Sequence, residues 1–167
     1  RDVLGVAYDA IPKHVKRLEL GPDVRQIPEG AIKDSKIKTI TGKDFKFYQE
    51  DVCSEDGLEK IFNENEIDSV IHFAGFKAVG ESVAIPIRYY HNNITGTLNL
   101  CDIMSKHNVK KIVFSSSATV YGDPATVPIT EDFPLHATNP YGRTKLFIEE
   151  ILRDLYVSDN EWDIVIL

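Results

Sequence analysis

The stretch Val70-Ile71-His72-Phe73-Ala74-Gly75 is a short, almost wholly apolar run that ends in a small residue and a glycine. A continuous apolar run of this length, without alternation, is typical of a strand that is covered on both faces, as in a parallel sheet. The run therefore predicts a buried strand over residues 70–73, which ends at Ala74 and Gly75.

Similar apolar runs alternate with stretches of helical period on both sides of this strand. Residues 45–48 predict a strand that ends at Asp51 and Val52, and Ser54 is a good N-cap for a helix with Leu58, Ile61 and Phe62 on one face. The other predicted elements are a helix over about 83–107, a strand over 111–114, a helix capped by Asn139 with Pro140 at its first position, and a strand over 163–167. Alternating strands and helices predict an α/β fold with a parallel sheet.

Composition excludes several classes of protein. The chain has 167 residues, enough for one domain, and its formal charge of −7 disfavours nucleic acid as a partner. No apolar stretch approaches the ~20 residues of a membrane span, so neither a membrane protein nor a membrane partner is expected. Cys53 and Cys101 lie far apart and the five histidines stand singly, so we expect no metal site and a reducing, cytoplasmic compartment.

Polar or glycine positions follow the ends of three predicted strands, where ligands bind in open parallel sheets. They are Asp51 and Val52, residues 73–75 with Lys77, and residues 115–117, which are all serine. Each one alone is more often a plain turn or polar loop. Their coincidence on successive strands predicts a ligand site at that edge of the sheet.

Tyr141 and Lys145 are four residues apart at the start of a predicted helix, so they share one face. Lowering a phenol pKa from about 10 to 7 needs about 4 kcal/mol, which an ammonium about 4 Å away supplies in a partly screened site. Tyr141 could thus take a proton from a substrate hydroxyl, with Ser117 bonded to the same oxygen. Oxidation of that alcohol requires a hydride acceptor, which predicts a nicotinamide cofactor. The alternative is a chance pairing on an amphipathic helix.

Three runs resemble a known family, the UDP-glucose 4-epimerases of the extended short-chain dehydrogenases/reductases. They are Val70-Ile71-His72-Phe73-Ala74-Gly75-Phe76-Lys77-Ala78-Val79-Gly80-Glu81-Ser82, Val113-Phe114-Ser115-Ser116-Ser117-Ala118-Thr119-Val120-Tyr121-Gly122 and Asn139-Pro140-Tyr141-Gly142-Arg143-Thr144-Lys145. The resemblance covers residues 27–167 and implies a partial, doubly wound Rossmann domain that holds NAD. A smaller C-terminal domain would grip the UDP-sugar.

The resemblance also implies roles for individual residues. Tyr141 would be the base at the sugar 4-hydroxyl, Lys145 would lower its pKa and bond the nicotinamide ribose, and Ser117 would bond the same sugar oxygen. Hydride would leave C4 of UDP-glucose or UDP-galactose and return to the other face of a 4-keto sugar. The implied cofactor contacts, besides Tyr141 and Lys145, are Asp51, Val52, Phe73, Ala74, Gly75, Lys77, Asn93 and Ser115. The helix around residues 94–104 and the helix after Tyr141 would pair between subunits of a homodimer.

The chain also departs from this family. It contains no GxxGxxG turn. We expect the substrate domain, which in the family would follow Leu167, to be missing as well. Residues 1–26 match poorly and read as irregular, with a candidate strand over 3–8 and Asp9 as a candidate ribose contact. We therefore expect a Rossmann sheet truncated at both ends, and an isolated fragment that is inactive and binds NAD weakly. The alternatives are a nucleotide-sugar dehydratase or decarboxylase, which would carry an acidic residue beside Ser117, and a non-catalytic Rossmann-like binding module.

Overall fold

The computed structural model describes residues 46–167, and residues 48–167 belong to one compact unit. The predicted irregular segment at 1–26, the strand at 3–8 and Asp9 lie outside the described residues.

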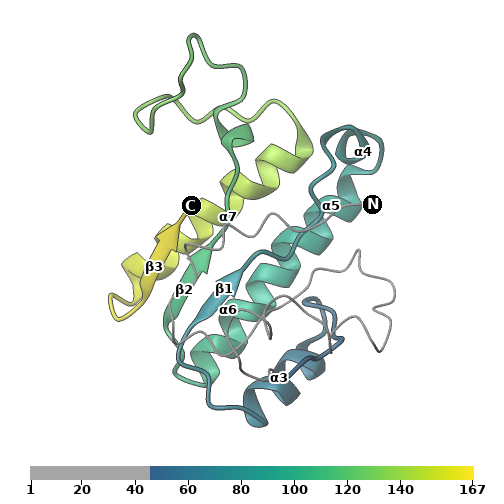
Figure 1. Ribbon diagram of the computed structural model, residues 1–167, viewed down its shortest axis with the longest axis vertical. Helices are drawn as coiled ribbons and strands as arrows, with labels where there is room; N and C mark the ends of the chain where they lie inside the picture. Colours follow the sequence, from purple (N-terminus) through teal and green to yellow (C-terminus); the bar gives the residue numbers. More distant parts are fainter. Residues whose placement is uncertain (1–45) are drawn as a thin grey trace, which may run out of the picture. The chain divides into compact units, whose positions relative to one another are not determined.

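Three parallel strands form the sheet of the described part: β1 (Val70–His72), β2 (Lys111–Phe114) and β3 (Asp163–Ile166), in the order β1-β2-β3 (Figure 1). Ile112 stands opposite Val70 on one side and Ile164 on the other. All three strands lie where the apolar runs predict them. The α/β class and the parallel sheet are therefore confirmed.

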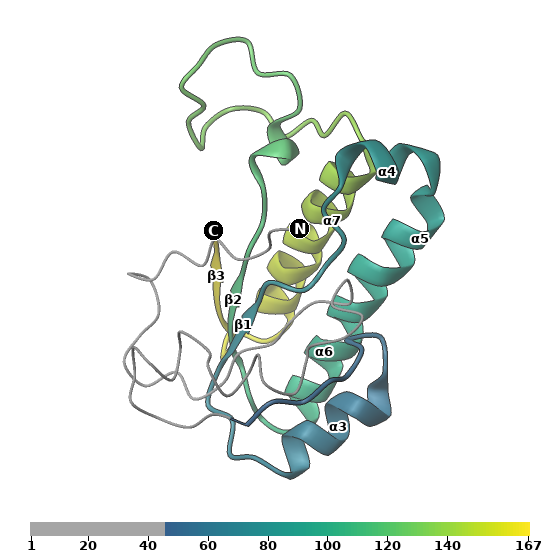
Figure 2. The same cartoon turned by 45° about the vertical axis from the view of Figure 1, so that its right-hand side comes forward.

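Helices α6 (Gly96–Lys106) and α7 (Pro140–Ser158) lie against one face of the sheet, and α3 (Glu55–Asn63) packs beside α6 (Figure 2). Leu58, Leu100, Ile112, Ile148 and Leu152 are each at most 2% exposed in the core between these elements. Among residues 46–167 no helix covers the opposite face, so the described part holds one of the two helical layers of a doubly wound fold.

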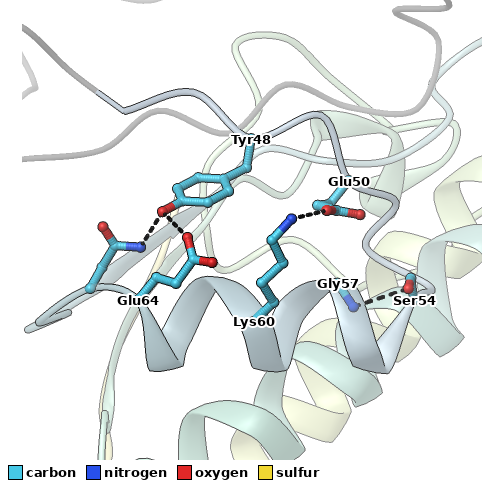
Figure 3. Close-up of polar contacts among 7 residues, drawn as sticks. Tyr48, Glu50, Ser54, Gly57, Lys60 and Glu64 are labelled. Carbon is cyan, nitrogen blue, oxygen red and sulfur yellow. Dashed lines mark hydrogen bonds and ion pairs between the residues drawn. The ribbon is translucent and has the colours of Figure 1, made fainter.

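The segment before α3 differs from its prediction. Ser54 does cap α3, because its Oγ accepts a hydrogen bond from the Gly57 N–H at 3.1 Å. Residues 46–48, however, form no strand, and the Tyr48 hydroxyl instead donates to Glu64 Oε2 at 2.8 Å (Figure 3). A strand needs backbone hydrogen bonds to a neighbour, and none of the three described strands pairs with this segment.

The long helix predicted over 83–107 is interrupted. Its path begins earlier, at α4 (Val79–Ala84), breaks at Ile85, and continues as α5 (Pro86–Tyr90), a π-helical turn η2 (His91–Thr95) and α6. Ile85 has φ −133° and ψ 57°, outside the helical region. The residue before a proline avoids the helical region, and Pro86 has no N–H to donate backwards, so α4 and α5 are separate helices.

The start of α7 is as predicted. The side chain of Asn139 accepts a hydrogen bond from the Gly142 N–H at 2.8 Å, and Pro140 occupies the first turn, where no N–H is needed. This cap fixes where the helix begins and so which way Tyr141 and Lys145 project. No described helix combines the length and the apolar character needed to cross a bilayer.

Candidate functional site

Helix α7 begins in close contact with the turn that follows β2. A Cβ on Gly142 would lie 2.8 Å from the carbonyl oxygen of Thr119, so only glycine allows this approach. Thr119 belongs to η3 (Ala118–Tyr121), a short 3₁₀ turn that begins directly after Ser117. The first turn of α7, which carries Tyr141, is thereby placed beside the chain that carries Ser117.

Lys145 ties the next turn of α7 to the end of β2. Its Nζ donates to the carbonyl oxygen of Ser115 at 2.7 Å and lies 4.6 Å from the centre of the Phe114 ring. The residue is only 5% exposed, and this burial lowers the pKa of Lys145 to about 8. At neutral pH the ammonium therefore still carries its proton in most molecules.

Ser117 is the N-cap of η3. Its Oγ accepts hydrogen bonds from the Thr119 backbone N–H at 3.3 Å and from the Thr119 hydroxyl at 2.9 Å. These bonds use acceptor positions of the oxygen and leave the Ser117 hydroxyl proton available as a donor. Thr119 was not among the predicted site residues. The signal available in the sequence was its position two residues after Ser117, the last of the three serines.

Tyr141 is 9% exposed, and its ring belongs to a small apolar cluster with Phe76 and Tyr89. Its backbone N–H donates to Ser82 Oγ at 3.2 Å. Within the described residues, no hydrogen bond joins the side chains of Tyr141, Lys145 and Ser117 to one another. The structure thus brings their backbones together, and their joint action stays a prediction.

The chain after β1 makes a turn that only glycine favours. Gly75 has φ +152°, and a Cβ there would lie 3.2 Å from Asn93 Oδ1. Asn93 Oδ1 accepts from the Phe76 N–H at 2.8 Å, and its Nδ2 donates to the Phe76 carbonyl at 3.0 Å and to Thr144 Oγ1 at 3.0 Å. Asn93 therefore joins this turn to α7.

The other predicted cofactor contacts differ in how their side chains are placed. Val52 and Ala74 are 7% and 9% exposed and belong to the core, so only their backbones could reach a ligand. Asp51 is exposed, and its Oδ1 accepts from the Cys53 N–H at 2.8 Å. Phe73 is 45% exposed and Lys77 is exposed, so both side chains are accessible at the end of β1.

Two buried titratable side chains near the site, His72 and Glu149, were not predicted. His72 in β1 is 1% exposed, its Nε2 lies 2.9 Å from Thr97 Oγ1, and burial lowers its pKa to about 3, so the ring is neutral. The Thr97 hydroxyl donates to the Asn93 carbonyl at 2.7 Å, so His72 Nε2 carries the proton of the first bond. Glu149 is 5% exposed on α7. The sequence offered a signal for each of them. His72 is a polar residue inside an apolar strand, and Glu149 is a carboxylate one helical turn after Lys145.

The arrangement can support proton transfer at a ligand oxygen. A phenol, a buried ammonium and a serine hydroxyl lie on two adjoining segments at the carboxyl end of a parallel sheet, where ligands of such folds bind. Within residues 46–167 no group of three or more His, Cys, Asp or Glu side chains is placed to hold a metal ion.

A protein-family model described as GDP-mannose 4,6 dehydratase matches residues 25–166. UDP-glucose 4-epimerase from Bacillus subtilis is 65% identical over 133 residues, and the enzyme from Dictyostelium discoideum is 62% identical over 132. These alignments cover 80% and 79% of this chain, which spans 39% and 38% of the length of the two relatives.

A solved structure shows the same likeness in three dimensions. UDP-glucose 4-epimerase from Bifidobacterium longum, in complex with NAD+ and UDP, superposes with a TM-score of 0.77 at 57% sequence identity. The match covers 83% of this chain and 41% of that one.

Proposed function

Since this chain belongs to the NAD-dependent epimerase/dehydratase family that includes the UDP-glucose 4-epimerases, we propose that the whole protein interconverts UDP-glucose and UDP-galactose by epimerisation at C4. The observation that carries the proposal is the placement of α7. Its first two turns contact the residues on either side of Ser117, because Gly142 lies against Thr119 and Lys145 binds the Ser115 carbonyl.

The end of β1 fits a dinucleotide. Gly75 adopts a backbone conformation that L side chains rarely adopt, the turn is fixed by Asn93, and Phe73 and Lys77 stand exposed beside it. A glycine turn at this edge of the sheet lets the backbone approach a bound dinucleotide closely. The residues that would hold NAD are Asp51, Val52, Phe73, Ala74, Gly75, Lys77, Asn93, Ser115, Tyr141 and Lys145. When bound, NAD supplies the acceptor and donor of the hydride exchanged at C4.

In this reaction the side chains of the protein transfer a proton from and to one oxygen, that of the sugar 4-hydroxyl. Tyr141 takes the proton of the sugar 4-hydroxyl and returns it after the 4-keto sugar has turned over. The Lys145 ammonium favours the phenolate by charge, because at neutral pH it is still mostly protonated despite its burial. Ser117 donates a hydrogen bond to the same sugar oxygen and steadies its developing charge.

Two further properties belong to the proposal. The whole protein is a homodimer in the cytoplasm, and apolar side chains on three helices support the dimer: Ile87 of α5, Leu98 of α6 and Phe147 of α7 are 77%, 46% and 46% exposed. Exposed apolar groups on neighbouring helices are typical of an interface. A sizing measurement on the whole protein tests this.

The second candidate is a 4,6-dehydratase, which the description of the matching family model favours. Such an enzyme would carry an acidic residue beside the serine, whereas Ala118 and Thr119 follow Ser117 here. This sequence favours epimerisation.

The deciding experiment supplies the whole protein with UDP-galactose and separates the products by chromatography. Formation of UDP-glucose is expected, while loss of water from the sugar identifies the dehydratase, and binding without turnover identifies a non-catalytic module. Tyr141→Phe should abolish turnover. Tyr156→Phe is the matched control, because Tyr156 is 52% exposed on the same helix. The 167-residue chain alone is expected to be inactive.

A further inference from the structure

Glu149 is a buried carboxylate on the site face of α7. It follows Lys145 by one helical turn, as Lys145 follows Tyr141, so the three residues are in line. Glu149 is only 5% exposed, and carboxylates are rarely buried so completely unless each oxygen has a partner. The roles proposed above for Tyr141, Lys145 and Ser117 do not use it.

Both oxygens of Glu149 are engaged. Oε1 accepts a hydrogen bond from the Ser116 hydroxyl at 2.5 Å, and Oε2 accepts from Arg153 Nη2 at 3.0 Å. Arg153 has a half-exposed side chain and also pairs with Glu150. One carboxylate oxygen thus binds Arg153 at the surface, and the other binds Ser116, the residue directly before Ser117.

Residues 115–117, which we call the serine segment, are held at successive positions. The Ser115 N–H donates to the His72 carbonyl at 3.1 Å, and the Ser116 N–H donates to the Leu167 carbonyl at 2.8 Å. Lys145 binds the Ser115 carbonyl and Glu149 binds the Ser116 side chain. Two turns of α7 therefore fix the two residues that precede Ser117.

We propose that Glu149 is a positioning residue of the epimerase reaction. Its hydrogen bond to Ser116 holds the serine segment against α7, and this places the Ser117 hydroxyl on the sugar oxygen that Tyr141 deprotonates. The inference rests on the proposed function. Glu149 itself touches neither sugar nor cofactor in this scheme, and it acts through Ser116.

The reaction is sensitive to such placement, because a misplacement of about 1 Å at a reacting group can cost roughly a hundredfold in rate. A residue that only stabilises the fold would change the free energy of unfolding and leave the turnover of the folded enzyme intact. A positioning residue lowers kcat while the binding of the UDP group, made elsewhere, keeps KM.

The activity test compares five variants of the whole protein with the wild type. Glu149→Leu and Ser116→Ala should each lower kcat at least tenfold with KM within about twofold, and the double variant should fall no further, because both remove the same bond. Glu149→Gln keeps an acceptor oxygen and should restore most of kcat. Glu150→Leu is the matched control, because Glu150 is the exposed neighbour that shares Arg153.

A second measurement is independent of activity. Amide hydrogen exchange at residues 115–119 of the 167-residue chain should be faster in Ser116→Ala and Glu149→Leu than in Glu150→Leu, with residues 70–72 unchanged. Normal kcat in both Ser116→Ala and Glu149→Leu would overturn the inference and leave the epimerase proposal standing. A wild-type protein without turnover would overturn the proposed function. Unchanged exchange in Ser116→Ala and Glu149→Leu would overturn the inference that Glu149 holds the serine segment against α7.

Discussion

Replacing the buried Lys145 by methionine should change how the stability of the chain depends on pH. Burial lowers the pKa of Lys145 from its usual 10.5 to about 8, so the folded chain gives up this proton more readily than the unfolded chain. The gap corresponds to about 3 kcal/mol of folding free energy, because one pKa unit is worth about 1.4 kcal/mol. The cost is fully present below pH 8 and disappears as the pH rises toward 10.5.

Between pH 7 and pH 9.5 this linkage predicts a gain of roughly 2 kcal/mol in the free energy of unfolding of the wild type relative to Lys145→Met. Urea denaturation of both chains at the two pH values measures the gain, and other titrating groups cancel in the difference. Lys111→Met is the matched control, because Lys111 is an exposed lysine at the other end of β2. If the difference in unfolding free energy between the wild type and Lys145→Met is the same at pH 7 and at pH 9.5, the argument that Lys145 is charged in a desolvating site is refuted.

Two further substitutions test the turns around the site by urea denaturation. Gly122→Ala should destabilise the chain by about 2 kcal/mol or more, because Gly122 has φ +63° and a Cβ would lie 2.0 Å from the His136 carbonyl oxygen. Gly80→Ala in α4 is the control. A Cβ there would meet nothing within 4 Å, so this substitution should be neutral or stabilising by up to about 1 kcal/mol. Asn93→Asp should cost about 2–3 kcal/mol, because it loses both donors of a side chain that is 3% exposed. Asn63→Asp at the exposed end of α3 loses one solvent-exposed bond to Glu59 and should cost less than about 1 kcal/mol. Equal stabilities within either pair would contradict the contacts described.

Local chemistry made most of the fold predictable. The caps at Ser54 and Asn139 use short side chains that satisfy backbone N–H groups within the same turn, so their effect is confined to neighbouring residues. The three strands are short, mainly apolar runs, and they pair in the sheet in the order in which they occur in the chain. The pairing of Tyr141 with Lys145 on one helix face also follows from helical spacing alone.

The features that sequence reasoning missed depend on distant partners. A strand at 46–48 requires a neighbour that the apolar pattern cannot supply, and Tyr48 bonds to Glu64 instead. The engagement of Asn93 with Phe76 and Thr144 joins residues 17 and 51 positions away in the chain. The break at Pro86 was readable from the sequence, since proline restricts the residue before it, but the helical period on both sides concealed it.

The approach of Gly142 to Thr119 has a consequence for engineering. One rigid rod carries the phenol, the ammonium and the carboxylate, so their spacing along its axis is set by helical rise and cannot drift independently. Residues 139–149 can therefore be transplanted as one cassette into a homologous scaffold, provided that the recipient keeps a backbone carbonyl in the place where Gly142, the third residue of the helix, leaves room for it.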